Sequence, residues 1–205
     1  MAPHLLALPP KKTSEILVAL VQRDSERLSI GEIVYTLGPQ AFALLVFVLG
    51  LPNCLPMPPP IPFLCGLLLA VVAIQMIIGL QVPWLPGRLL RRSVLRADVK
   101  RAVEQALPRL RMLERLSRAR LTLFGSSIGM RIIGAIVFVI ALGLLVAAPF
   151  IGQIPLGLAA CLVGLGLVER DGAIVLGGVL LGIIGIGLSL GFLAAIVGGI
   201  LALFF

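Results

Sequence analysis

The sequence predicts an all-helical integral membrane protein, and three observations support this fold class. Apolar residues make up 60% of the 205-residue chain, and charged residues only 13%. The mean hydropathy is +1.15, whereas soluble proteins are about a quarter charged. The apolar runs are continuous, without the alternating polarity of a membrane β-barrel. Helices satisfy their own backbone hydrogen bonds in lipid, so they are the expected elements.

Composition divides the chain into five segments. The order along the chain is a tail with a surface amphipathic helix, a membrane hairpin, a basic segment, a second hairpin and a glycine-rich tract. The corresponding residues are 1–40, 41–80, 81–131, 132–172 and 173–205. The amphipathic helix of the first segment is predicted over residues 13–37, because apolar residues recur there at helical spacing.

The first hairpin is broken by proline. Residues 52–62 contain six prolines and separate the apolar runs 41–51 and 63–80. Such a density of proline excludes a regular helix. The first run is short against the roughly 20 residues of a full span. This favours a re-entrant turn within the membrane, unless residues 33–40 extend the first arm.

The second hairpin repeats this arrangement and precedes an uncharged tract. Its arms are residues 132–148 and 156–168, and its break, residues 149–155, again contains proline. The final tract, residues 173–205, is too long for one perpendicular span. We expect two helices broken near residues 185–191, or else one long tilted helix.

The two hairpins align with each other. Residues 47–51 match residues 138–142 at an offset of 91, and Ile61-Pro62 matches Ile154-Pro155 at an offset of 93. The alignment also pairs Gly38 with Gly129 and Gly79 with Gly172. We interpret this as an internal duplication. Duplicated broken helices are typical of secondary transporters, but a structural unit with proline turns at the membrane surface fits equally well.

Positive charge is concentrated between the hairpins. Residues 81–131 hold twelve of the 17 Lys and Arg residues above an apolar stripe that begins at Leu95. The pattern predicts one or two amphipathic surface helices on the cytoplasmic side of the membrane. Anionic lipid headgroups are the expected partners, and no nucleic-acid-reading module accompanies the charge. The residues assigned to lipid are Arg88, Arg91, Arg92 and Arg96.

A few polar residues lie in or beside apolar stretches, and we assign them to substrate contact or coupling. They are Asn53, Gln75, Gln153, Glu169, Arg170 and Asp171. Ionisable groups inside a membrane are costly and usually paired or functional. If the second hairpin ends at the interface, its three charged residues form only a hydrated loop. The two amides in the breaks either satisfy backbone groups or touch a ligand.

Nothing in the sequence indicates an enzyme, a metal site or a cofactor. Hydrolytic and nucleotide-binding motifs are absent. Cys54, Cys65 and Cys161 have no ligand spacing and are interpreted as buried small hydrophobic residues. Glycine pairs four residues apart, such as 178/182 and 187/191, are typical of helix-packing faces. The glycine-rich tract is therefore a candidate homodimer surface.

Four motifs resemble the ExoD family of bacterial exopolysaccharide-synthesis membrane proteins. They are Leu51-Pro52-Asn53, Leu55-Pro56-Met57-Pro58-Pro59, Pro83-Trp84-Leu85-Pro86 and Leu167-Val168-Glu169-Arg170-Asp171-Gly172. Pro60 departs from the family, whose members often continue that run with glycine. The resemblance implies a multi-pass protein of the bacterial inner membrane, linked to exopolysaccharide production and, in some members, to alkali tolerance. It supplies no reaction.

Three functions remain open on these observations. The first is a carrier or flippase-like transporter of an anionic, lipid-linked polysaccharide intermediate. The second is a non-transporting scaffold or regulator of polysaccharide assembly. The third is ion or proton transport linked to alkali tolerance.

Overall fold

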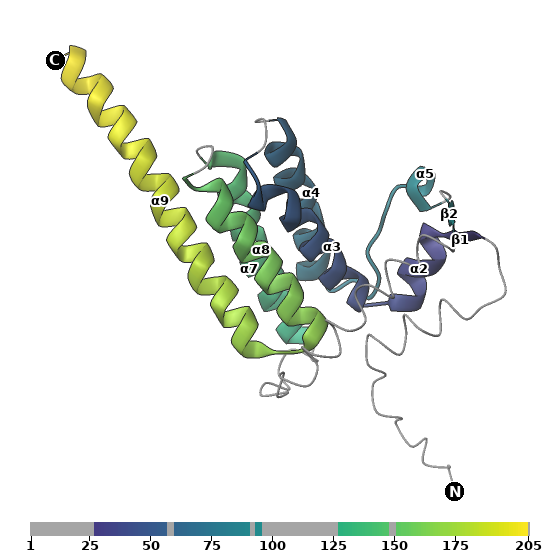
Figure 1. Cartoon of the computed structure of the whole chain (residues 1–205). Coiled ribbons are helices and arrows are strands. Elements are labelled where there is room, and N and C mark those ends of the chain that lie inside the picture. The colour runs from purple at the N-terminus through teal and green to yellow at the C-terminus, as the bar shows by residue number, and fades with distance from the viewer. Residues whose placement is uncertain (1–26, 57–59, 91–92, 96–126, 148–150, 205) are drawn as a thin grey trace, which may run out of the picture. The chain divides into compact units, whose positions relative to one another are not determined.

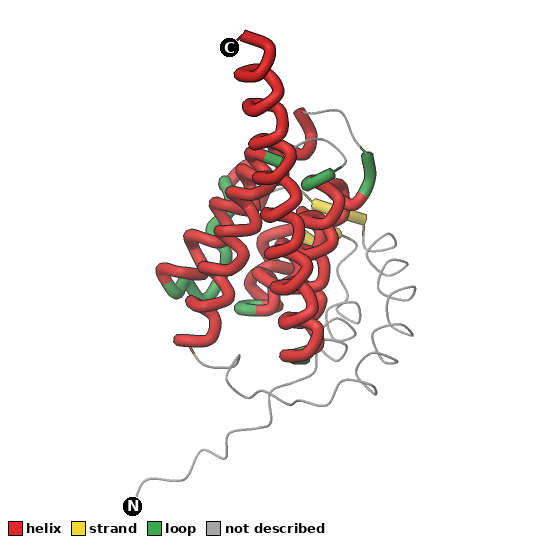
Figure 2. The backbone as a smooth tube through the Cα atoms, turned by 90° about the vertical axis from the view of Figure 1, so that its left-hand side faces the viewer, coloured by secondary structure: helices red, strands yellow, loops and turns green. Residues whose placement is uncertain are grey.

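The computed structural model describes residues 27–56, 60–90, 93–95, 127–147 and 151–204. The chain forms two compact units. The small unit is drawn from residues 1–37 and 85–116, and the bundle unit from residues 38–84 and 117–205. Helices dominate the described residues (Figure 2), as the composition predicts.

The small unit pairs a short strand with helix α2. Strand β1 (Arg27–Ser29) lies antiparallel to β2 (Ser93–Leu95), with Ser29 opposite Ser93. Helix α2 (Ile30–Leu37) follows β1 directly, and α5 (Gly87–Leu90) packs against it. The Ser29 hydroxyl accepts a hydrogen bond from the Glu32 backbone N–H at 3.1 Å, which caps the start of α2.

Two expectations for this region are wrong. The helix predicted over residues 13–37 is helical only from Ile30 in its described part, because residues 27–29 form β1. Leu95, expected in a helical stripe, lies in β2 opposite Arg27. Strands β1 and β2 pair with each other although they are far apart in the sequence, and such tertiary pairing overrides local periodicity. Most of the predicted basic helices, residues 96–126, fall outside the described residues.

The bundle unit contains the apolar helices (Figure 1). They are α3 (Gln40–Gly50) with the 3₁₀ helix η1 (Leu51–Cys54), α4 (Pro60–Ile78), α7 (Ser127–Val146), α8 (Gln153–Glu169) and α9 (Gly172–Phe204). Three segments are long and apolar enough to cross a membrane: Pro60–Ile78, Ile128–Val146 and Gly172–Ala202. Large apolar side chains are exposed along α4 and α9, as expected of surfaces that face lipid.

Both breaks are narrower than predicted. Helix α4 begins at Pro60 and includes Pro62, and α8 includes Pro155 in its first turn. Proline is tolerated in a first turn because its missing N–H has no helical partner there. Residues 33–40 do not extend the first arm continuously. Helix α2 ends at Leu37, and Gly38 takes φ +54°, a left-handed conformation that interrupts the helix.

The two hairpins pack crosswise. Helix α3 packs mainly against α8, and α4 packs mainly against α7, while contacts within each hairpin are fewer. Both crosswise pairs are antiparallel: Gly50 approaches Cys161 and Gly157 approaches Asn53, while Gly66 approaches Ala141 and Gly134 approaches Ala73. The breaks therefore share one end of the bundle, here called the break end (Figure 1). The opposite end, where α4 and α8 finish, is called the charged end.

Glycine allows this close packing. A methyl group at Gly164 would lie 2.5 Å from the backbone nitrogen of Phe47, and one at Gly134 would lie 2.8 Å from the Met76 Cβ. Lipid is as apolar as the helices, so their association depends on van der Waals packing rather than on exclusion of water. Small residues at the contacts supply this packing. The core beside them includes the fully buried Phe42, Leu69 and Ile133.

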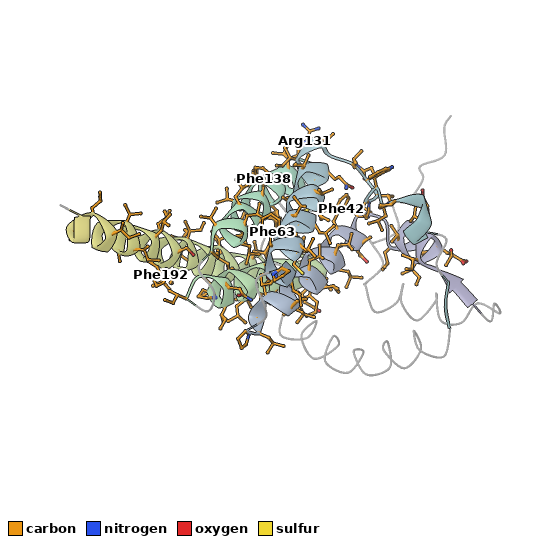
Figure 3. All side chains as sticks on the ribbon, turned by 90° about the horizontal axis from the view of Figure 1, so that it is seen from above. Phe42, Phe63, Arg131, Phe138 and Phe192 are labelled. Atoms are coloured by element: carbon orange, nitrogen blue, oxygen red, sulfur yellow. The ribbon has the colours of Figure 1, made fainter. Side chains whose placement is uncertain are left out.

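Helix α9 is continuous from Gly172 to Phe204, so the break expected near residues 185–191 is absent and the long-helix alternative holds. Gly178 and Gly185 pack against Val163 and Leu156 of α8. From Leu190 to Ala202 every residue is exposed, and this part of α9 projects past the other helices (Figure 1). Phe192 lies on the projecting part (Figure 3).

Candidate functional site

The first break buries an amide. Asn53 is fully buried in η1, and its Nδ2 donates a hydrogen bond to the Leu49 carbonyl at 2.9 Å. Its Oδ1 is also buried and has no hydrogen-bond donor among the described residues. Gly157 of α8 lies against it, because a methyl group there would be 2.5 Å from the Asn53 carbonyl carbon. The α8 backbone thus packs directly against the backbone and Cβ of Asn53.

The second break reaches the first through a hydrogen bond. Gln153 begins α8, is 3% exposed, and donates from Nε2 to the Leu55 carbonyl at 3.1 Å. The structure therefore brings the two predicted amides, Asn53 and Gln153, to the same end of the bundle.

A third polar residue, Ser189 of α9, reaches the same end and was not expected from the sequence. It is buried, its hydroxyl donates to the Gly185 carbonyl at 2.8 Å, and Gly152 packs directly against it. The available signal was that Ser189 is the only polar residue in residues 173–205. Asn53, Gln153 and Ser189 are together called the break-end cluster.

Two cysteines also meet near this end. The Sγ atoms of Cys54 and Cys161 lie 3.6 Å apart, although the residues are 107 positions apart in the chain. Cys161 is buried and Cys54 is half-buried. Cys161 is thus the buried small residue that the sequence predicts, whereas Cys54 is only half-buried, and the contact between the two was not expected from their spacing. Within the described residues, no group of three or more His, Cys, Asp and Glu side chains could hold a metal ion.

At the charged end, Arg170 and Asp171 form the turn between α8 and α9. Arg170 adopts φ +55°, and its N–H bonds to the Leu167 carbonyl, while the Asp171 N–H bonds to the Gly166 carbonyl at 2.8 Å. These are the paired hydrogen bonds of a helix C-terminus that ends in a residue of left-handed conformation. The Asp171 Oδ1 accepts a hydrogen bond from the Ala173 N–H at 2.8 Å and caps α9. Both residues thus have local structural roles.

Gln75 has a structural role at the same end. Its side chain binds both backbone groups of Trp84, whose indole is exposed. Gly79 ends α4 with φ +89°, and a methyl group there would lie 3.1 Å from the Arg131 guanidinium. Arg131 thus places a positive charge near the negative end of the α4 dipole, at the periphery of the bundle (Figure 3).

The predicted site residues therefore separate into two groups. Gln153 and Glu169 are the first and last residues of α8, which places them about 24 Å apart at the helical rise per residue. Asn53 and Gln153 lie at the break end. Gln75, Glu169, Arg170 and Asp171 lie at the charged end. The side chains predicted to bind lipid, those of Arg88, Arg91, Arg92 and Arg96, fall outside the described part of the structure.

Known proteins resemble this chain over most of its length. A family model described as "Exopolysaccharide synthesis, ExoD" matches residues 13–191. Protein ExoD of Rhizobium meliloti (strain 1021) is 30% identical over 164 residues, which are 74% of this chain and 64% of that protein. An uncharacterised protein of Synechocystis is 28% identical over 151 residues, covering 72% of this chain and 70% of that protein. No solved structure matches.

Proposed function

Because this chain belongs to the ExoD family of exopolysaccharide-synthesis proteins, we propose that it carries an anionic, lipid-linked intermediate of such a polysaccharide within the membrane. The observation that carries this proposal is the Asn53 Oδ1, buried between two membrane hairpins without a described donor. In this proposal the break-end cluster contacts the saccharide part of the intermediate.

The chemistry of the break-end cluster suits a carbohydrate. A buried, unpaired polar atom costs about 1–3 kcal/mol, and a sugar hydroxyl is a donor that would remove this cost. The Asn53 and Gln153 amides and the Ser189 hydroxyl offer both donors and acceptors. Their present hydrogen bonds, such as the one from Gln153 to the Leu55 carbonyl, join neutral groups and are weak. A hydroxyl-rich ligand can replace them with hydrogen bonds of its own.

The crosswise packing supports the further proposal that the hairpins are duplicated. The alignment of residues 47–51 with 138–142 places α3 on α7, and that of Ile61-Pro62 with Ile154-Pro155 places α4 on α8. The contact of α3 with α8 then corresponds to the contact of α4 with α7, and these are the two main contacts between the hairpins. Both hairpins run in the same direction, so the repeat is parallel, related by an axis along the membrane normal.

In the carrier proposal, the basic segment binds the phosphate of the intermediate. In this proposal its arginines lie in the cytoplasm by the positive-inside bias. Arg88, Arg91, Arg92 and Arg96 bind the phosphate of the intermediate, or anionic headgroups beside it. The break end then faces the opposite side of the inner membrane, where the intermediate is released.

Transbilayer movement of a fluorescent polyprenyl phosphate in proteoliposomes tests the carrier. We expect movement with the full-length protein and its loss in Asn53→Ala, which removes the buried amide oxygen. Gln81→Ala removes an exposed amide and serves as the matched control, with full movement expected. No movement above empty liposomes, from protein with intact helical circular dichroism, would reject the carrier.

The same assay decides whether the charged end couples transport. The double variant Arg170→Gly, Asp171→Asn removes both charges, while glycine keeps the left-handed turn and asparagine can still cap α9. Loss of movement in this variant, with stability retained, would assign coupling to these charges. Full movement would leave Arg170 and Asp171 with structural roles alone.

A scaffold is the second candidate function, favoured by the projecting part of α9. Residues 190–202 are exposed and uncharged, and Gly191, Ala195 and Gly199 recur there four residues apart. Such spacing allows another membrane helix to approach closely, either from a polysaccharide-assembly protein or from a second copy. The double variant Gly191→Ile, Gly199→Ile should then abolish co-purification of a partner or formation of the homodimer. Movement of polyprenyl phosphate should stay at the wild-type level, whether or not the wild type moves it.

A further inference from the structure

The thiols of Cys54 and Cys161 meet between the two hairpins. Their Sγ atoms are 3.6 Å apart, near van der Waals contact, whereas a disulfide bond is about 2.05 Å long. Cys54 ends η1 in the first hairpin, and Cys161 lies inside α8 in the second. The α3 and α8 backbones are held close here, because a methyl group at Gly50 would lie 2.9 Å from the Cys161 nitrogen.

We infer that Cys54 and Cys161 are a redox-active pair that forms an intramolecular disulfide between the hairpins. Each thiol now points at a backbone carbonyl of the α3–η1 segment, Cys54 at Gly50 (3.5 Å) and Cys161 at Phe47 (3.6 Å). These are weak interactions that a small rotation of either side chain gives up. The inference does not depend on the carrier proposed above.

Unequal access assigns the two thiols different roles. Cys54 is half-buried and Cys161 is buried, so an incoming disulfide oxidant meets Cys54 first. The Cys54 sulfur, on losing its proton, attacks the oxidant, forms a mixed disulfide and releases one thiol. The Cys161 sulfur then loses its proton, attacks the Cys54 sulfur of that mixed disulfide and releases the second thiol. Two protein thiols are oxidised, and one disulfide of the oxidant is reduced to two thiols.

The disulfide would fix the hairpins against each other at a particular place. It would link the end of η1, next to the buried Asn53, to the helix whose first residue is Gln153. Movement of the first break relative to α8 would then be blocked, while the charged end would keep its own hydrogen bonds. Reduction would restore the thiol pair and the freedom of the first break.

The test uses the full chain in proteoliposomes with Cys65→Ala, which removes the third cysteine. The probe is 4,4′-dithiodipyridine, a small apolar disulfide that releases a coloured thiopyridone for each thiol it oxidises. We expect two thiopyridones per chain. After denaturation and trypsin digestion, the fragments 28–88 and 132–170 should migrate together, and separate on reduction.

Two variants distinguish this result from independent labelling. In Cys65→Ala, Cys161→Ala we expect one thiopyridone and a stable mixed disulfide on Cys54. In Cys54→Ala, Cys65→Ala, the buried Cys161 should react much more slowly than Cys54 does. The inference is overturned if the Cys65→Ala protein keeps a stable mixed disulfide, links two copies through fragment 28–88, or releases thiopyridone only after denaturation.

Discussion

Gln75 holds Trp84 by both of its backbone groups. The Trp84 N–H donates to the Gln75 Oε1 at 2.6 Å, and the Gln75 Nε2 donates to the Trp84 carbonyl at 3.2 Å. The Gln75 side chain thereby satisfies the backbone hydrogen-bonding groups of Trp84, which lies outside any helix or strand. The chain leaving α4 is tied to the last turns of that helix, at the charged end of the bundle.

Gln75→Leu should release this segment. Loss of two hydrogen bonds should lower stability by roughly 1–3 kcal/mol, partly offset because leucine suits an apolar helix. The chain has one tryptophan, so tryptophan fluorescence anisotropy in detergent reports on Trp84 alone and should fall. Gln81→Leu makes the same change at an exposed position and should leave the anisotropy at the wild-type value. Equal anisotropy in all three proteins would contradict the role assigned to Gln75.

Arg170→Gly should raise stability, because the left-handed conformation of Arg170 costs a residue with a side chain about 1–2 kcal/mol. We expect a gain of about 1 kcal/mol, measured by unfolding in mixed micelles with increasing sodium dodecyl sulfate. Arg170→Val should lose about as much, since a branched side chain is least tolerated there. A valine variant as stable as the glycine variant would mean that the turn is not left-handed.

Asp171→Ala should weaken the start of α9. The aspartate side chain accepts the Ala173 N–H, and removing such a cap costs about 1 kcal/mol. Asp171→Asn retains an oxygen acceptor and should lose only a small part of this, the dipole contribution of the charge. The same micelle unfolding measurement separates the two variants. If asparagine is as damaging as alanine, the charge of Asp171 matters more than its cap.

Gly164→Ala should separate α3 from α8. The added methyl group would meet the Phe47 backbone at 2.5 Å, and backbone cannot rotate away as a side chain can. We expect a loss of about 1–3 kcal/mol, the range for overpacked cores. Gly177→Ala adds the same group to α9 where nothing lies within 4 Å, and should be neutral or gain up to about 1 kcal/mol. Similar unfolding curves for the two variants would contradict the close contact.

The positions of the breaks were predictable, but the partners of the helices were not. Proline density located both breaks. The breaks are narrower than predicted, because Pro60 and Pro155 lie inside the first turns of α4 and α8. A helix that is apolar on every side carries no periodic signal for its packing face. Glycines such as Gly164 mark that face, but their spacing does not name the helix opposite. The crosswise pairing of α3 with α8 therefore required the structure.

The candidate site was predictable only in part. Asn53 and Gln153 stood out as amides within the two breaks, and the structure places both at one end of the bundle. Cys54 and Cys161 lie 107 residues apart, and no sequence spacing links them. Arg170 and Asp171 attracted a functional interpretation as charges beside an apolar helix. Their backbone conformation and capping, which sequence does not display, explain their presence locally.

Crosswise packing also sets an order of assembly during synthesis. When the ribosome has completed α4, neither α3 nor α4 has met its main partner, because α8 and α7 are still to be made. We therefore expect the first hairpin to remain with its glycine faces uncovered until the second hairpin is made. Two chains made separately, ending and beginning within residues 96–126, should find each other and rebuild the same bundle.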